Sequence, residues 1–179
     1  SACQYSLSVT ALLAEEAPRV VAATFTRAKW LQERLPVATA EIEDMWTSMR
    51  LSERKLLIVQ QMMDEAEAET VRCEREIEQC NEELAVDDDR MELSEEERIE
   101  IFNEIRVLEV EFAHYCRVFA TRSQEKKDIH AALLRIAEQR RAMLGDKQKL
   151  LEELADLRSH VPAALVVTEG IGPATEAAM

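Results

Sequence analysis

The chain has 179 residues, with 3 glycines, 4 prolines, 4% aromatic residues and 32% charged residues. A β-sheet protein needs a turn about every 8–12 residues, and these few turn-forming residues cannot supply them. The composition therefore excludes a sheet protein and indicates a mostly helical chain. The net charge of −14 repels phosphate backbones, which argues against nucleic acid as a partner. No uninterrupted apolar stretch reaches the roughly 20 residues that a bilayer crossing requires, so we expect no membrane insertion.

The negative charge is concentrated in the middle of the chain. Residues 64–111 carry 20 acidic and 5 basic side chains, whereas residues 1–63 carry seven of each. This imbalance predicts one strongly acidic region. It is either a solvated surface that keeps the protein in solution or a docking site for a basic protein surface.

We predict an all-α fold, a long antiparallel coiled-coil helical hairpin, and take its parts in chain order. Residues 1–17 are expected to form a short N-terminal helix and connector that packs near the base of the hairpin. Arm one covers 18–85, with a kink at Pro36 because a proline inside a helix removes a hydrogen bond. An acidic turn covers 86–93. Arm two covers 94–160 and begins at a capping-box sequence with Ser94 at the N-cap.

The hairpin prediction rests on a seven-residue apolar repeat, which favours a coiled coil over a globular amphipathic helix. The repeat extends backward through Pro36 in the same phase and includes Ala28 and Leu31. From residue 42 the first apolar stripe is Ile42, Met45, Met49, Ser52, Leu56, Val59, Met63, Ala66, Thr70, Cys73, Ile77, Cys80 and Leu84. The second stripe is Ile101, Ile105, Leu108, Phe112, Tyr115, Phe119, Arg122, Lys126, Ile129, Leu133, Ile136, Arg140, Met143, Lys147, Leu150, Leu154, Leu157 and Val161.

A short connection between two such arms enforces antiparallel pairing. A turn centred at Asp89 predicts that the numbers of facing residues add up to 178, which sets Ala66 opposite Phe112 and Ser52 opposite Lys126. A register shifted by half a heptad fits nearly as well. Each arm would be roughly 100 Å long at 1.5 Å per residue. A parallel homodimer formed through residues 94–160 is an alternative.

The sequence offers no arrangement typical of catalysis, of a cofactor site or of a metal site, so we expect a non-catalytic protein. Cys73 and Cys80 are one heptad apart, about 10 Å along one helix, which is too far for a disulfide between them and favours buried thiols. The histidines have no ligand partner at helical spacing. The run Asp87-Asp88-Asp89 lacks the alternating oxygens and the glycine of a calcium loop.

Residues that remain outside the stripes are the candidates for partner binding. A two-helix structure cannot bury them, and exposed aromatic residues commonly anchor interfaces. We expect the irregular tail, residues 161–179, to contribute by strand addition. The candidate partner-binding residues are Trp30, Trp46, Ile99, Phe102, Val107, Val110, Asp87, Asp88, Asp89, Val166 and Val167.

These features predict a structural or scaffold subunit that bridges partner proteins in a large complex. The leading setting is a cytoskeletal or ciliary assembly in the cytoplasm, and an accessory or stalk-like subunit of a mitochondrial membrane complex is the runner-up. A second hypothesis is a regulatory binding module that captures a basic client through the acidic region.

Overall fold

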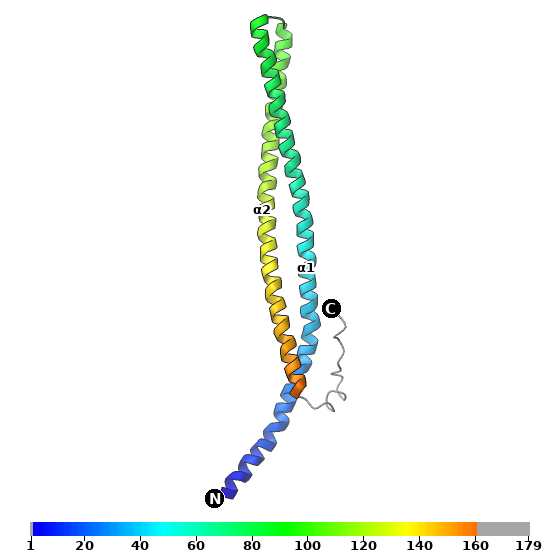
Figure 1. Ribbon diagram of the computed structural model, residues 1–179, viewed down its shortest axis with the longest axis vertical. Coiled ribbons are helices and arrows are strands. Elements are labelled where there is room, and N and C mark those ends of the chain that lie inside the picture. Colours follow the sequence, from blue (N-terminus) through cyan, green and yellow to red (C-terminus); the bar gives the residue numbers. More distant parts are fainter. Residues whose placement is uncertain (1, 161–179) are drawn as a thin grey trace. The chain divides into compact units, whose positions relative to one another are not determined.

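The computed structural model describes the backbone of residues 2–160 and the side chains of residues 18–160. Two helices account for almost all of it: α1 is Ala2–Arg90 and α2 is Glu95–His160 (Figure 1). The chain divides into two units, one made of Ser1–Thr47 and Glu138–Met179 and the other of Ser48–Ala137. No strand occurs in the described range, which confirms the all-helical prediction.

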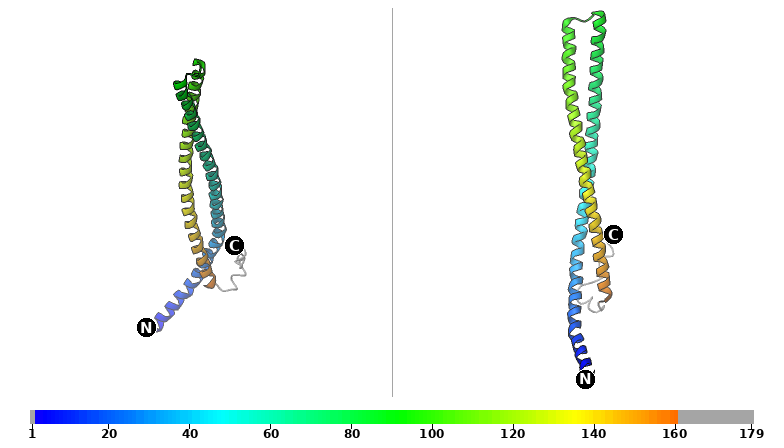
Figure 2. Two further views of the ribbon diagram at one scale, coloured as in Figure 1. Left: turned by 45° about the horizontal axis from the view of Figure 1, so that its top comes forward. Right: turned by 90° about the vertical axis from the view of Figure 1, so that its left-hand side faces the viewer.

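The unit of residues 48–137 is a helical hairpin. The final half of α1 and the first part of α2 run in opposite directions and lie side by side in both views of Figure 2. Two polar contacts join the arms well away from the connection. Arg72 Nη2 lies 3.0 Å from Glu111 Oε2, and Lys126 Nζ donates to Gln60 Oε1 at 2.6 Å.

The other unit contains a second stretch of α1 packed against the end of α2. Ala28, Leu31 and Leu154 form a buried cluster, and the partly buried side chains of Leu35 and Leu150 pack against it. At the edge of this cluster the Arg27 guanidinium binds both oxygens of Glu153, at 2.7 and 3.0 Å. Such bidentate pairs fix geometry more than they add stability at an exposed site.

The predicted apolar stripes are the buried sides of both helices. Every buried apolar side chain in the described residues lies on one of them: Ala28, Leu31, Ala38, Ile42, Val59, Met63, Ala66, Cys73, Cys80, Leu84, Leu108 and Leu154. The spacing of three and four residues returns to the same side of a helix, so one face of each arm is removed from water. Burial of that face is the main source of stability in each unit.

The predicted pairing register is wrong by about one heptad. The numbers of contacting residues add up to 183 for Arg72 with Glu111, 186 for Gln60 with Lys126 and 185 for Asp87 with Arg98, rather than 178. The cause is that the connection lies further along the chain than Asp89. Ala66 therefore faces the level of Phe119, and Phe112 faces the level of Cys73.

The connection consists of residues 91–94 and is shorter than the predicted acidic turn at 86–93. Helix α1 continues through the aspartates to Arg90, and Met91 adopts a left-handed conformation with φ of 50°. The backbone N–H of Met91 donates to the Asp87 carbonyl at 2.7 Å, which completes the last helical turn. Three consecutive aspartates did not end the helix because Asp87 is held by partners beyond it.

The capping box at the start of α2 is confirmed. The backbone N–H of Glu97 donates to Ser94 Oγ at 3.2 Å, and the N–H of Ser94 donates to Glu97 Oε2 at 2.7 Å. These reciprocal bonds satisfy amides that have no partner inside the helix. The acidic residues Glu95, Glu96 and Glu97 in the first turn also suit the positive end of the helix dipole.

Helix α1 continues through Pro36 without a break, and Pro18 also lies inside the helix rather than at its start; the kink expected at Pro36 stays a prediction. On one side of Pro36, Leu31 and Leu35 pack in the cluster with α2, and on the other Thr39 Oγ1 donates to the Leu35 carbonyl at 2.9 Å. Packing on the inner face therefore outweighs the lost backbone hydrogen bond.

The separate N-terminal helix predicted for residues 1–17 is not confirmed, because α1 already begins at Ala2. Residues 2–17 contain neither glycine nor proline, so nothing in that segment interrupts a helix. The predicted tail at 161–179 lies outside the described residues. Gly145 lies inside α2, with open space where a Cβ would lie.

Candidate functional site

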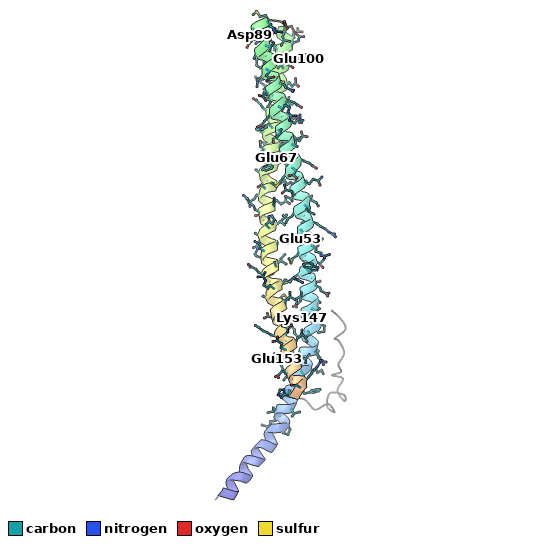
Figure 3. The ribbon with its side chains drawn as sticks, viewed as in Figure 1. Glu53, Glu67, Asp89, Glu100, Lys147 and Glu153 are labelled. Carbon is teal, nitrogen blue, oxygen red and sulfur yellow. The ribbon has the colours of Figure 1, made fainter. Side chains whose placement is uncertain are left out.

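The region of greatest functional interest is the acidic end of the hairpin, defined here as residues 64–111. It comprises the last turns of α1, the connection and the first turns of α2, all within the unit of residues 48–137. Figure 3 labels Glu67, Asp89 and Glu100 in this region. Both halves of the acidic sequence come together here because the connection folds α2 back along α1.

Asp87 has a structural role in the hairpin. Its side chain is 3% exposed, and it follows Leu84 on the buried stripe by three residues. The carboxylate accepts a hydrogen bond from the Leu93 backbone N–H at 2.6 Å and one from Arg98 Nη1 at 2.5 Å. The Leu93 N–H and then the Arg98 guanidinium hold the pKa of this carboxyl below its usual value. Both oxygens of Asp87 are engaged within the hairpin, and partner binding through Asp87 stays a prediction.

The other two aspartates lie at the surface. Asp88 pairs with Arg98 Nη2 at 3.1 Å, but its side chain remains 65% exposed. Asp89 is exposed in the last turn of α1. Both carboxylates can therefore be reached by a partner, and binding through them stays a prediction.

One side of the acidic end contains a cluster of compensated charges around Arg72. Its guanidinium contacts Glu69 at 2.7 Å, Glu76 at 2.9 Å and Glu111 at 3.0 Å. Hydrogen bonds to these three carboxylates raise the Arg72 pKa above its ordinary value. On this side of the hairpin, a single base therefore balances carboxylates from both arms.

A shallow groove follows α1 on another part of this surface, and we call it the α1 groove. Its lining is Glu74, Ile77, Glu78, Asn81, Glu82, Ala85 and Phe112. Acidic side chains line it along α1, while the apolar atoms come from both arms. A second groove is nearer the connection, lined by Gln79, Glu82, Glu83, Val86, Asp87, Glu92 and Leu93. Neither groove has a direct signal in the sequence, although the glutamates at every fourth position from 74 to 82 mark one helix face.

The predicted apolar candidates in α2 are exposed as expected. The exposed fractions are 53% for Ile99, 49% for Phe102, 58% for Val107 and 68% for Val110. Helical spacing places them around the side of α2 that faces away from the buried stripe, so they do not converge on one pocket. Their role in partner binding stays a prediction.

The two tryptophans lie outside the buried stripes, and each is paired with an arginine. The Arg27 guanidinium lies 4.4 Å from the centre of the Trp30 ring, and that of Arg140 lies 4.8 Å from the centre of the Trp46 ring. The tryptophans remain 45% and 41% exposed. Both are therefore accessible to a partner, with an arginine stacked beside each ring.

Arg140 carries the single buried side-chain nitrogen or oxygen without a hydrogen-bond partner among the described residues, its Nε. Arg140 occupies a position of the predicted apolar stripe. A buried donor without a partner is unfavourable, and stacking on Trp46 offsets part of that cost.

The cysteines agree with the prediction of buried thiols on the stripe. Cys73 is 0% exposed and Cys80 is 8% exposed, and burial raises the pKa of both thiols. Cys116 is exposed. No group of three histidine, cysteine or acidic side chains able to hold a metal ion occurs within the described part of the chain. Neither helix, over the residues described, has a segment long and apolar enough to cross a bilayer.

Val166 and Val167, which are predicted to add a strand to a partner, lie outside the described residues.

The chain matches no protein-family model, and it resembles no curated protein and no solved structure. The residues of the chain themselves must therefore carry the functional argument.

Proposed function

We propose that this chain is a non-catalytic structural subunit, an antiparallel coiled-coil hairpin that bridges partner proteins in a multiprotein assembly. The observation that carries the proposal is the contrast between its buried stripes and its remaining apolar side chains. The stripes bury one line of residues on each helix, while bulky side chains outside them, including Trp30, Trp46 and Phe102, stay 41–49% exposed. Exposed aromatic side chains of this kind are common anchors of protein interfaces.

The proposed setting is a cytoskeletal or ciliary assembly, and a stalk-like position in a mitochondrial membrane complex is the alternative. Long paired helices are suited to holding partners at a fixed separation, because their stiffness comes from a continuous apolar stripe. Both proposed settings rest on analogy of shape alone.

Crosslinking mass spectrometry on the native assembly tests this proposal. The complex should be purified in low salt and again in about 0.5 M salt, where surface electrostatics are screened. Lysines near the exposed apolar residues, such as Lys29 and Lys149, should crosslink to other proteins under both conditions. A chain that is recovered alone, without crosslinks to another protein in low salt, would contradict the scaffold role.

A second candidate function is reversible capture of a basic client protein by the acidic end. The α1 groove supports it, because three of its lining residues are glutamates and its floor is partly apolar. Electrostatic complementarity of this kind accelerates association and selects the partner. Salt separates the two candidates: capture by the acidic end should weaken steeply with ionic strength, whereas apolar bridging contacts should persist.

A further inference from the structure

We infer that the α1 groove is a docking site for a basic amphipathic helix of another protein, with Glu74, Glu78 and Glu82 binding its lysine or arginine side chains. This inference deepens the second candidate function and rests on it. It identifies the place of capture, the chemistry of the partner and the form in which the partner binds.

The glutamates of the α1 groove differ from those around Arg72 in whether a basic side chain pairs with them. No ion pair or hydrogen bond within the described residues engages the carboxylates of Glu74, Glu78 or Glu82. Around Arg72, by contrast, a single base compensates three carboxylates from both arms. Arg75 and Arg106 are close in sequence or in register to the groove, yet neither forms an ion pair with it. The groove therefore presents uncompensated negative charge.

The spacing of the three groove glutamates lowers the stability of α1. Like charges at positions i and i+4 repel each other along a helix, and the groove contains two such pairs in succession, from residue 74 to 78 and from 78 to 82. Internal stability gives no reason for this arrangement. A basic partner that supplied the missing positive charge would relieve this repulsion on binding.

The length and the apolar lining of the α1 groove fit a helical partner. The groove extends from residue 74 to residue 85 of α1, about 17 Å at 1.5 Å per residue, or three helical turns. Its floor includes apolar atoms of Ile77, Ala85 and Phe112. A third helix can place one apolar row on this floor and basic side chains against the glutamates, as amphipathic helices do in other helical grooves. A strand would find no sheet edge here to extend.

The other occupants fit less well. A second copy of this chain would bring its own acidic end, and residues 64–111 carry 20 acidic and 5 basic side chains. The same charge opposes a nucleic acid. A basic helix matches both the charge and the apolar floor.

Fluorescence anisotropy with the full chain and a labelled helical peptide tests the inference. The peptide has about 14 residues, or four turns, with leucine on one face and lysine at every fourth position beside it. A control peptide carries glutamate in place of each lysine. The basic peptide should bind in about 50 mM salt and weaken as salt rises, whereas the acidic peptide should not bind.

The charge of the groove is tested by the triple variant Glu74→Gln, Glu78→Gln and Glu82→Gln. Its matched control removes the same number of charges from exposed positions outside the groove: Glu65→Gln, Glu96→Gln and Glu100→Gln. Removing three weak charge contacts at once should raise the Kd roughly tenfold. The control should raise it about twofold through long-range attraction alone.

The floor is tested by Ala85→Gln, which fills the groove without changing charge, against Ala68→Gln at an exposed position of the same helix. Ala85→Gln should weaken binding of the basic peptide, and Ala68→Gln should leave it unchanged. Circular dichroism verifies that every variant keeps its helices. Equal loss in the groove variant and its charge control would overturn the groove site and leave general capture by the acidic end standing. No binding of the basic peptide to the unmodified chain would overturn both, and salt-sensitive self-association abolished by the groove variant would assign the groove to a second copy.

Discussion

The carboxylate of Asp87, in the last turn of α1, lies 2.5 Å from the guanidinium of Arg98, in the first turn of α2. The same carboxylate accepts the Leu93 N–H from the connection. One buried side chain thus ties together the end of α1, the connection and the start of α2. It explains how only four residues, 91–94, join two antiparallel helices in a region rich in negative charge.

Replacing Asp87 should therefore destabilise the hairpin more than replacing either of its neighbours. Asp87→Asn retains the shape but loses the charge that Arg98 requires, and Asp87→Ala also leaves the Leu93 N–H without its partner. Losing a charge-assisted hydrogen bond should lower the Tm by about 3–6 °C, measured by circular dichroism. Asp89→Asn, at an exposed position beside it, serves as the control, and equal melting temperatures for the two asparagine variants would contradict this role.

The contribution of Asp87 should also depend on pH. Its pKa in the folded protein is lowered, first by the Leu93 N–H and then by Arg98, from an ordinary value near 3.9. A lowered folded pKa means that the stabilisation is fully present above the ordinary value and is lost as pH falls through the folded one. The stability difference between the unmodified chain and Asp87→Asn should be constant from about pH 5 to 7 and shrink below about pH 4. A difference that grows on acidification would contradict this sign.

The capping box gives a prediction for the start of α2. Ser94→Ala removes the oxygen that accepts the Glu97 N–H and should cost about 1 kcal/mol of unfolding free energy. Urea titration followed by circular dichroism measures this change. Thr121→Ala, an exposed position inside α2, should be neutral or slightly stabilising because alanine favours the helix interior. If both substitutions had the same effect, Ser94 would not act as a cap.

The thiols should differ sharply in reactivity. Cys116 is exposed, whereas Cys73 and Cys80 are buried, and burial raises the pKa of their thiols so that little thiolate forms. The test uses a Cys3→Ser variant, which leaves these three thiols. An aromatic disulfide reagent should react promptly with one thiol per chain, and with the other two more than roughly tenfold more slowly, at the rate of local opening. The same reagent in denaturant should titrate all three at once. Rapid reaction of all three thiols in native buffer would mean that solvent reaches the apolar stripe between the helices.

The positions of the buried apolar side chains could be predicted from the sequence because helical spacing is a local property. Spacings of three and four residues identify the same face whatever the partner is, and Leu31, Cys73 and Leu108 all follow it. The pairing register could not be predicted in the same way. It depends on where the connection lies, and the predicted and observed registers differ by one heptad, which keeps the same apolar stripes facing each other.

The ends of the helices and the groove depend on contacts between distant residues. The aspartate run favours a turn by local propensity, but Arg98, eleven residues beyond Asp87, stabilises the additional helical turn. Pro36 likewise favours a break, and packing of Leu31 and Leu35 against α2 prevents it. The sequence reveals that residues 64–111 are acidic, yet the difference between the carboxylates around Arg72 and those of the α1 groove depends on both arms.

Disulfide trapping within a single chain tests the antiparallel pairing and its register most directly. In a background with the native cysteines replaced by alanine, one variant carries Ala66→Cys with Phe119→Cys, and another carries Ala66→Cys with Phe112→Cys. In the observed register, positions 66 and 119 lie at the same level, whereas position 112 lies about 10 Å further along the helix. A disulfide requires Cα atoms within roughly 7 Å.

The oxidised products should be identified by peptide mass spectrometry and non-reducing electrophoresis. We expect a disulfide within one chain between positions 66 and 119, and none between 66 and 112. Efficient trapping of 66 with 112 would restore the register centred on Asp89. Disulfide-linked dimers in place of a bond within one chain would contradict the hairpin itself.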